Sequence, residues 1–164
     1  MSPDLQRHVD KYYGKYSGTV TDNQDAQQVG CIKVTVPSVF GKDMEVTARP
    51  CLPYGHFFVP HVGAKVWVEF EAGDTHFPIW VGVWYPNGKP PPEAVITPPD
   101  NRVIQTPSGH TIEIMDKQGE EKIVIKHKSN AFVSIDKNGS VMLGNKNGST
   151  VVLNAKDKNV MVVE

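Results

Sequence analysis

Short stretches of alternating apolar and polar residues recur along the chain, and this alternation predicts β-strands. In residues 29–36 the apolar side chains Ile32, Val34 and Val36 share one face, and Lys33 and Thr35 share the other. Residues 63–71 repeat the pattern, and residues 79–84 are apolar on both faces, as expected of a strand that closes a barrel. Five such strands precede residue 86, which predicts a small closed barrel.

A proline-rich segment separates this pattern from a different one. Residues 86–99 contain six of the thirteen prolines, which is typical of a stiff, extended connector. We therefore predict an N-terminal arm at 1–15, a barrel at 16–85, a linker at 86–101 and a second domain at 102–164.

The second domain is a series of short apolar pairs separated by polar turns such as Lys137-Asn138-Gly139. Each repeat is one short strand and one turn. A thin ribbon of such strands cannot bury its apolar side alone, which implies partner chains. The pairs are Ile112/Ile114, Ile123/Ile125, Val133/Ile135, Val141/Leu143, Val151/Leu153 and Val160/Val162.

Two arrangements fit this spacing. In a parallel homotrimer, the apolar stripes of three copies would meet on one axis. In a monomeric β-sandwich or hairpin stack, the same stripe would pack within one chain. The pattern alone leaves both open.

Composition and charge exclude several classes of protein. The chain has 23 Val but only 4 Leu and 7 Ala, which excludes a helical bundle. Lys and Arg number 17 against 18 Asp and Glu, so charge gives no argument for a nucleic-acid or acidic-membrane partner. The first nine residues lack an apolar segment, so we expect synthesis in the cytoplasm without a signal peptide.

The residues that carry chemistry form no catalytic or metal signature. The six histidines do not have metal-ligand spacing, and no Gly-x-Ser-x-Gly motif is present. We therefore expect no enzyme activity, no catalytic residues, no metal site and no cofactor. One alternative stays open, because the alternation that places Ile123 and Ile125 inward also places His127 inward. An ion or a water could then lie beside it on a trimer axis.

Three ordered blocks of the sequence resemble the VgrG and phage baseplate central spike family. Residues 63–74, followed by Pro78-Ile-Trp-Val-Gly82 and Pro90-Pro91-Pro92, are similar to the end of that family's barrel and its exit linker. Residues 30–37 are similar to the family's second barrel strand, and residues 106–116, beginning Thr-Pro-Ser-Gly-His, are similar to the start of its stem. The matching motif residues, to which we assign structural roles, are Gly63, Gly73, Asp74, Pro78, Gly82, Ser108, Gly109 and His110.

The resemblance implies an all-β fold: an OB-fold barrel followed by an intertwined triple-stranded β-helix stem, assembled as a homotrimer. It favours the trimer over the monomer, with the twelve residues of the six apolar pairs as the trimer core. The implied function is the structural central spike of a contractile tail or tail-like injection system, located in the baseplate. Such a spike plugs the hub and tube and pierces the target envelope.

The resemblance also implies partners. Only about 15 residues precede the barrel, so we expect a separate hub protein there, and a PAAR-type tip protein at the other end. Two alternatives remain: an OB-type single-stranded nucleic-acid-binding protein, and a cell-wall-active effector of such a system. We expect no nucleic-acid partner, because the aromatic residues Phe57, Phe58, Trp67, Trp80 and Trp84 lack an accompanying basic groove. We expect these aromatic residues to pack between subunits instead.

Overall fold

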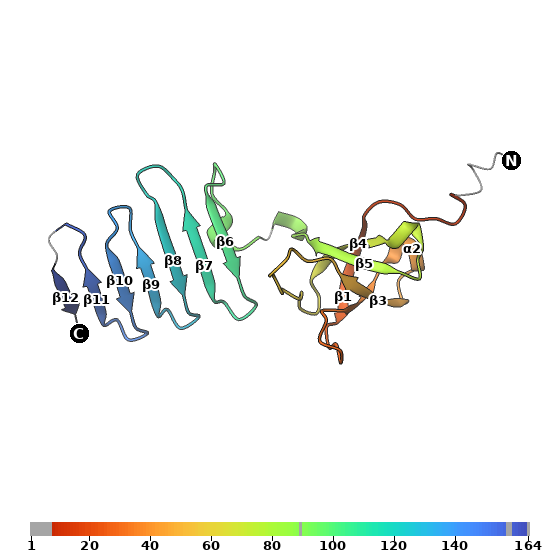
Figure 1. Cartoon of the computed structure of the whole chain (residues 1–164), viewed down its shortest axis with the longest axis horizontal. Helices are drawn as coiled ribbons and strands as arrows, with labels where there is room; N and C mark the ends of the chain where they lie inside the picture. Colours follow the sequence, from red (N-terminus) through yellow and green to blue (C-terminus); the bar gives the residue numbers. More distant parts are fainter. Residues whose placement is uncertain (1–7, 89, 157–158, 164) are drawn as a thin grey trace. The chain divides into compact units, whose positions relative to one another are not determined.

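The chain folds into two β-rich units in a computed structural model that describes residues 8–88, 90–156 and 159–163. The units comprise residues 1–88 and 89–164, and the division falls within the proline-rich segment. The first unit contains a closed barrel and the second a single sheet, as Figure 1 shows. The all-β prediction is confirmed.

The first unit is a five-stranded barrel with the strand order β1-β2-β3-β5-β4, closed by pairing of β4 with β1. All pairs are antiparallel except β3 with β5. This order agrees with the OB-like barrel that the resemblance implies. The strands are β1 (Tyr16–Asp22), β2 (Ile32–Thr35), β3 (Glu45–Pro50), β4 (Lys65–Phe70) and β5 (Pro78–Val83). A four-residue helix, α2 (Pro37–Phe40), follows β2 where the sequence predicts only the end of a strand.

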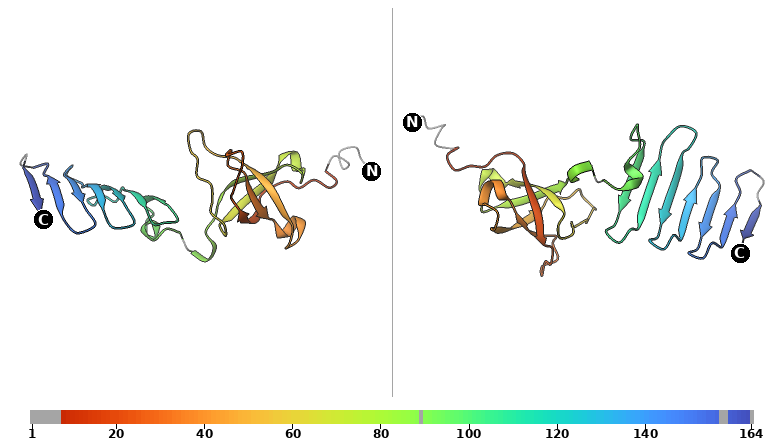
Figure 2. Two further views of the ribbon diagram at one scale, coloured as in Figure 1. Left: turned by 90° about the horizontal axis from the view of Figure 1, so that it is seen from below. Right: turned by 180° about the vertical axis from the view of Figure 1, so that it is seen from behind.

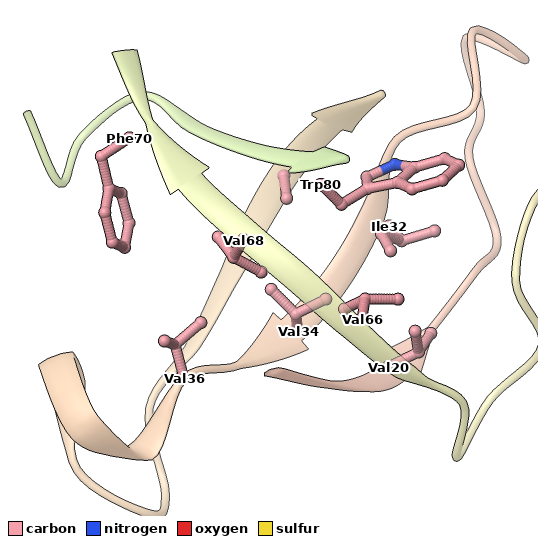
Figure 3. Packing of buried hydrophobic residues seen from close by; sticks show 9 residues of the cluster. Val20, Ile32, Val34, Val36, Val66, Val68, Phe70 and Trp80 are labelled. Carbon is pink, nitrogen blue, oxygen red and sulfur yellow. The ribbon is translucent and has the colours of Figure 1, made fainter. Parts of the chain in front are cut away.

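The core of the barrel consists of the inward-facing side chains of the alternating strands. Figure 3 shows Val20, Val34, Val66 and Val68 pointing into the interior beside Trp80. The indole Nε1 of Trp80 donates a hydrogen bond of 3.0 Å to a backbone carbonyl, that of Gly30. The apolar faces predicted for β2 and β4 are therefore the faces that the barrel buries.

Part of the N-terminal arm packs against the barrel. The Tyr12 amide donates to the carbonyl of Gly73 at 2.8 Å, and the Lys11 ammonium lies 3.3 Å from the Asp74 carboxylate. The Tyr12 ring also contacts Phe70 edge to face. Residues 1–7 of the predicted arm lie outside the described part of the chain.

The second unit is a seven-stranded antiparallel sheet in which the strands follow one another in sequence order. Figure 2 shows these strands in a single layer. The strands are β6 (Asn101–Gln105), β7 (Thr111–Met115), β8 (Lys122–Lys126), β9 (Phe132–Ile135), β10 (Val141–Gly144), β11 (Thr150–Leu153) and β12 (Val160–Val163).

The backbone ladders of this sheet are formed within one chain. Each strand from β7 to β11 pairs with both of its sequence neighbours, so among the described strands only β6 and β12 have an outer edge without a partner strand. The resemblance implies an intertwined triple-stranded β-helix, whereas in the structure the interior strands of this sheet pair within one chain. The winding of three chains around one another stays a prediction. The sheet offers partner chains two broad faces and two short edges.

Candidate functional site: the apolar face of the second sheet

Similar tight turns keep the successive strands of the second sheet in register. The Asp136 side chain accepts hydrogen bonds of 2.9 Å from the amides of Asn138 and Ser140. Asn145 forms the same pattern one hairpin later, with the amides of Asn147 and Ser149. The two backbone amides that donate to Asp136 lower the pKa of its carboxyl group below the usual value. Repetition of one turn geometry holds the apolar residues of neighbouring strands directly opposite one another.

The register places the twelve predicted core residues on one face of the sheet. Directly opposed residues of an antiparallel pair share a face, so the pairing can be followed from strand to strand. It produces two continuous rows across β7 to β12, which we call the apolar face. One row is Ile112, Ile125, Val133, Leu143, Val151 and Val162; the other is Ile114, Ile123, Ile135, Val141, Leu153 and Val160.

The apolar face is exposed in the single chain. Ile125 is 52% exposed, Leu143 44% and Val162 65%. The six strands span five spacings of about 4.8 Å and their width is about 14 Å, so the face covers about 24 Å by 14 Å. An uninterrupted apolar surface of this extent is typical of an interface.

The opposite face of the sheet differs in character along its length. Near the linker it is polar: the amide of Asn101 donates to the Glu93 carbonyl at 2.7 Å and to the Glu113 carboxylate at 2.8 Å. The Lys122 ammonium lies 3.4 Å from Glu113 as well. Further along, this face carries Met142 beside polar side chains of the turns. The face opposite the apolar rows thus carries ion-paired and hydrogen-bonded groups near the linker, together with the apolar residues Val124, Met142, Val152 and Met161.

The Thr-Pro-Ser-Gly-His motif forms the turn between β6 and β7. The Thr106 hydroxyl accepts a hydrogen bond of 3.0 Å from the His110 amide and lies 3.2 Å from the Ser108 hydroxyl. Gly109 adopts φ +92°, a conformation that favours glycine. The His110 ring contacts the His127 ring, with 4.5 Å between the ring centroids and 59° between the ring planes.

The motif residues of the barrel lie in its turns and in β5. Gly73 has φ +74°, and a Cβ there would lie 3.0 to 3.1 Å from atoms of the N-terminal arm. The Asp74 carboxylate accepts a hydrogen bond of 3.0 Å from the His76 amide, and this bond is the main reason why its pKa is lowered to about 2. Pro78 is buried at the start of β5. Gly63 and Gly82, with φ +89° and +154°, lie in open surroundings.

The aromatic residues of the barrel do not form one surface. Trp80 lies in the core, which corrects the expectation that it packs between subunits. Trp67 and Trp84 stack on each other, with 5.7 Å between their ring centroids. The exposed residues Phe57 and Phe58 lie in the loop before β4.

The charged groups beside these aromatic residues are paired. Glu69 forms an ion pair with Lys15, and Glu71 forms one with Arg49. The Lys65 ammonium donates to the Thr19 hydroxyl at 2.7 Å. These basic side chains are therefore already engaged by groups of the barrel itself.

Comparison with known proteins identifies both units. Residues 16–85 match the type VI secretion system/phage-baseplate injector OB domain. Residues 101–162 match the phage baseplate V C-terminal trimerisation domain. The chain belongs to the phage baseplate V family. A search of the curated proteins gives no match.

Membership of the baseplate V family assigns the two units their general roles. The protein is a structural component of a phage or type VI baseplate, with an injector barrel and a trimerisation domain. The apolar face falls entirely within the trimerisation domain. None of the described helices is long and apolar enough to cross a membrane.

Sequence reasoning missed one pair of residues that the structure brings together. The alternation within each strand does not relate His110 to His127, although the hairpin of β7 and β8 predicts their contact. They are equidistant from the centre of this hairpin, as are Ile112 and Ile125, which do pair. Within the described ranges, no three His, Cys, Asp or Glu side chains gather as a metal site.

Proposed function

We propose that this baseplate V protein is the central spike of a contractile tail or tail-like injection particle and acts as a homotrimer. The observation that carries the proposal is the apolar face: twelve aliphatic residues in two unbroken rows, ten of them exposed in the single chain. Three such sheets, packed with these faces inward, would enclose one apolar axis and expose the polar turns. The family's description as a trimerisation domain supports three copies rather than two.

The mechanism that we propose is mechanical. Because the strands are paired in sequence order, hydrogen bonds run along the length of the sheet, in the direction in which a stem would be loaded. Axial compression of a closed trimer then acts on close-packed aliphatic side chains and on backbone hydrogen bonds, which resist shortening. The protein would thereby plug the hub and tube and pierce the target envelope, with no catalytic step.

The proposed partners follow from the two ends of such a spike. We propose that a separate hub protein binds at the barrel and that a PAAR-type tip protein binds at the end of the sheet formed by β12. Contact with the target envelope would be transient. The four residues of β12 are apolar and all more than half exposed, which favours a covered position for that end.

Native mass measurement of the purified chain tests the proposal. We expect a single species of three copies that resists dilution. A stable monomer that binds single-stranded oligonucleotide would contradict it in favour of a nucleic-acid-binding barrel. Clearing of peptidoglycan by the pure protein in a zymogram would contradict it in favour of a cell-wall-active effector.

A further inference from the structure

Strands β7 and β8 end in two imidazoles on one side of the sheet. Thr111 pairs with Lys126, so His110 and His127 occupy the next opposed position of the same ladder. Their side chains alternate onto the apolar face, and their ring centroids are 4.5 Å apart. The Ser129 amide donates to Nδ1 of His127 at 3.1 Å, so the neutral ring carries its proton on Nε2. Nε2 is therefore a hydrogen-bond donor at this end of the apolar face.

The same two strands end in two carboxylates on the other side of the sheet. Asp116 and Glu121 are the first residues beyond the paired part of β7 and β8, one on each side of the turn, and both are exposed. Alternation from Ile114 and Ile123 places them on the apolar face. Arg102 agrees with this placement, because it lies opposite Ile114 on that face and forms an ion pair of 2.9 Å with Asp116.

Three-fold symmetry brings these two ends together. In the proposed homotrimer, on which this inference rests, each sheet forms one side of a prism and its strands run across that side. Figure 1 shows the turn between β7 and β8 on the opposite side of the sheet from the turns before β7 and after β8. A rotation that repeats one sheet in the next therefore places the imidazole end of one copy beside the carboxylate end of its neighbour.

We propose that His110 and His127 of one copy donate hydrogen bonds to the carboxylates of Asp116 and Glu121 in the next copy. Bonds of this kind, to an ionised acceptor, are about twice as strong as those between neutral groups. Three such clusters, one at each corner of the prism, close the ring of three copies. They also give the assembly a direction, because an inverted neighbour would place carboxylates against carboxylates.

The groups beside the two carboxylates leave acceptor oxygens for these bonds. Arg102 contacts Oδ2 of Asp116, and the Gly119 amide donates to Oε2 of Glu121 at 3.0 Å, so each carboxylate keeps a second oxygen. The backbone amides of Glu121 and Gly119 lower the pKa of the Glu121 carboxyl group, and Lys137 lowers it further. Glu121 is therefore ionised at neutral pH.

The charges of the turns on the two sides of the sheet are complementary as well. On the imidazole side, residues 106–110, 127–131 and 145–149 contain two lysines and no Asp or Glu. On the carboxylate side, residues 116–121 contain three acidic residues and one lysine. The basic side of one copy thus meets an acidic turn of the next, which favours the parallel arrangement.

Paired cysteines test this contact. Glu121 and His127 lie on opposite ends of β8, about 20 Å apart, so cysteines there cannot bridge within one chain. On oxidation with copper phenanthroline, we expect His127→Cys/Glu121→Cys to form covalent trimers on a denaturing gel. The matched control, His127→Cys/Asn147→Cys, places both cysteines on the imidazole side and should not form them. The two single variants report links through the natural Cys31 and Cys51.

A double-mutant cycle measures the strength of the contact. Residues about 20 Å apart in one chain contribute independently to stability, so any coupling between them comes from a neighbouring copy. In sedimentation experiments in guanidinium chloride, His127→Ala and Glu121→Ala should each weaken trimer association at least tenfold. The double variant should be no weaker than either single variant.

The outcomes separate this inference from the proposed function. A trimeric protein without the disulfide-linked trimers, or with independent effects of the two alanine variants, would overturn the inference and leave the homotrimer standing. A monomeric wild type in native mass measurement would overturn the proposed function itself, and this contact with it.

Discussion

Replacement of Leu143 by Asp places a carboxylate in the middle of the apolar face. Leu143 is 44% exposed in the single chain, so about half of its surface remains to be buried by partner copies. Complete burial of a Leu side chain stabilises by about 1.5–3 kcal/mol, and this remaining half therefore contributes about 1 kcal/mol per chain. An ionised carboxylate in the same place costs several kcal/mol more.

The lost apolar burial and the cost of the buried carboxylate both occur in each of the three chains of a homotrimer. The total loss is on the order of 10 kcal/mol, which lowers the trimer association constant by about seven powers of ten. We therefore expect Leu143→Asp to be monomeric at micromolar concentration and pH 7.5. Burial raises the pKa of a carboxyl group, so the trimer should be favoured again in acid and lost as the pH rises.

Native mass spectrometry and sedimentation measure the outcome, and tryptophan fluorescence reports whether the barrel remains folded. The matched control is Met142→Asp, because Met142 is the next residue of β10, lies on the opposite face and is 37% exposed. Leu143→Asn introduces a side chain of nearly the same shape as Asp but without the charge, and therefore separates the effect of charge from the effect of shape. A trimeric Leu143→Asp protein, or equal dissociation by Met142→Asp, would refute the assignment of the apolar face.

Three further changes test the barrel and the sheet. Trp80→Phe removes the buried hydrogen bond of Nε1, so the free energy of unfolding of the barrel in urea should fall by about 2 kcal/mol. The pKa of Asp74 is lowered to about 2, chiefly by the His76 amide, so stability present above about pH 4 should be lost as the pH falls through 2. Asp74→Asn should flatten that dependence in acid-unfolding curves. Gly144→Ala places a Cβ against the Phe132 ring, so the sheet should lose about 1–3 kcal/mol in urea unfolding followed by circular dichroism.

Each of these predictions has a contradicting result. An unfolding midpoint of Trp80→Phe equal to that of the wild type would show that the indole bond adds no stability. Superimposable acid-unfolding curves for Asp74→Asn and the wild type would show that the contact of Asp74 with the His76 amide adds no stability. For Gly144→Ala, the additional change Phe132→Leu should restore part of the loss, and its failure to do so would place the strain elsewhere.

The side-chain pattern of the sheet was predictable from the sequence because it depends on local geometry. Alternation assigns Ile112 and Ile114 to one face, and the polar turns fix where each strand begins. The same reasoning identified the inward face of β4. In both cases, the signal is the period of two residues that a β-strand imposes.

Which strands pair was less predictable, because hydrogen bonds between backbones carry no side-chain signature. An apolar stripe has the same spacing whether its neighbours belong to the same chain or to another. The contact of His110 with His127 depends on this pairing and was therefore missed. The packing of Tyr12 on the barrel was missed for another reason: its partners Phe70 and Gly73 lie some 60 residues away.

The repeated turn of the second sheet has a consequence for how such proteins change in evolution. Since Asp136 and Asn145 build turns of the same geometry, one hairpin can be copied or deleted without disturbing the register of its neighbours. Each hairpin adds two strand spacings, or about 9.6 Å, at constant width. The length of the sheet is thus a modular property, set by the number of turns. In the proposed spike, gene duplication within this one segment would match the stem to envelopes of different thickness.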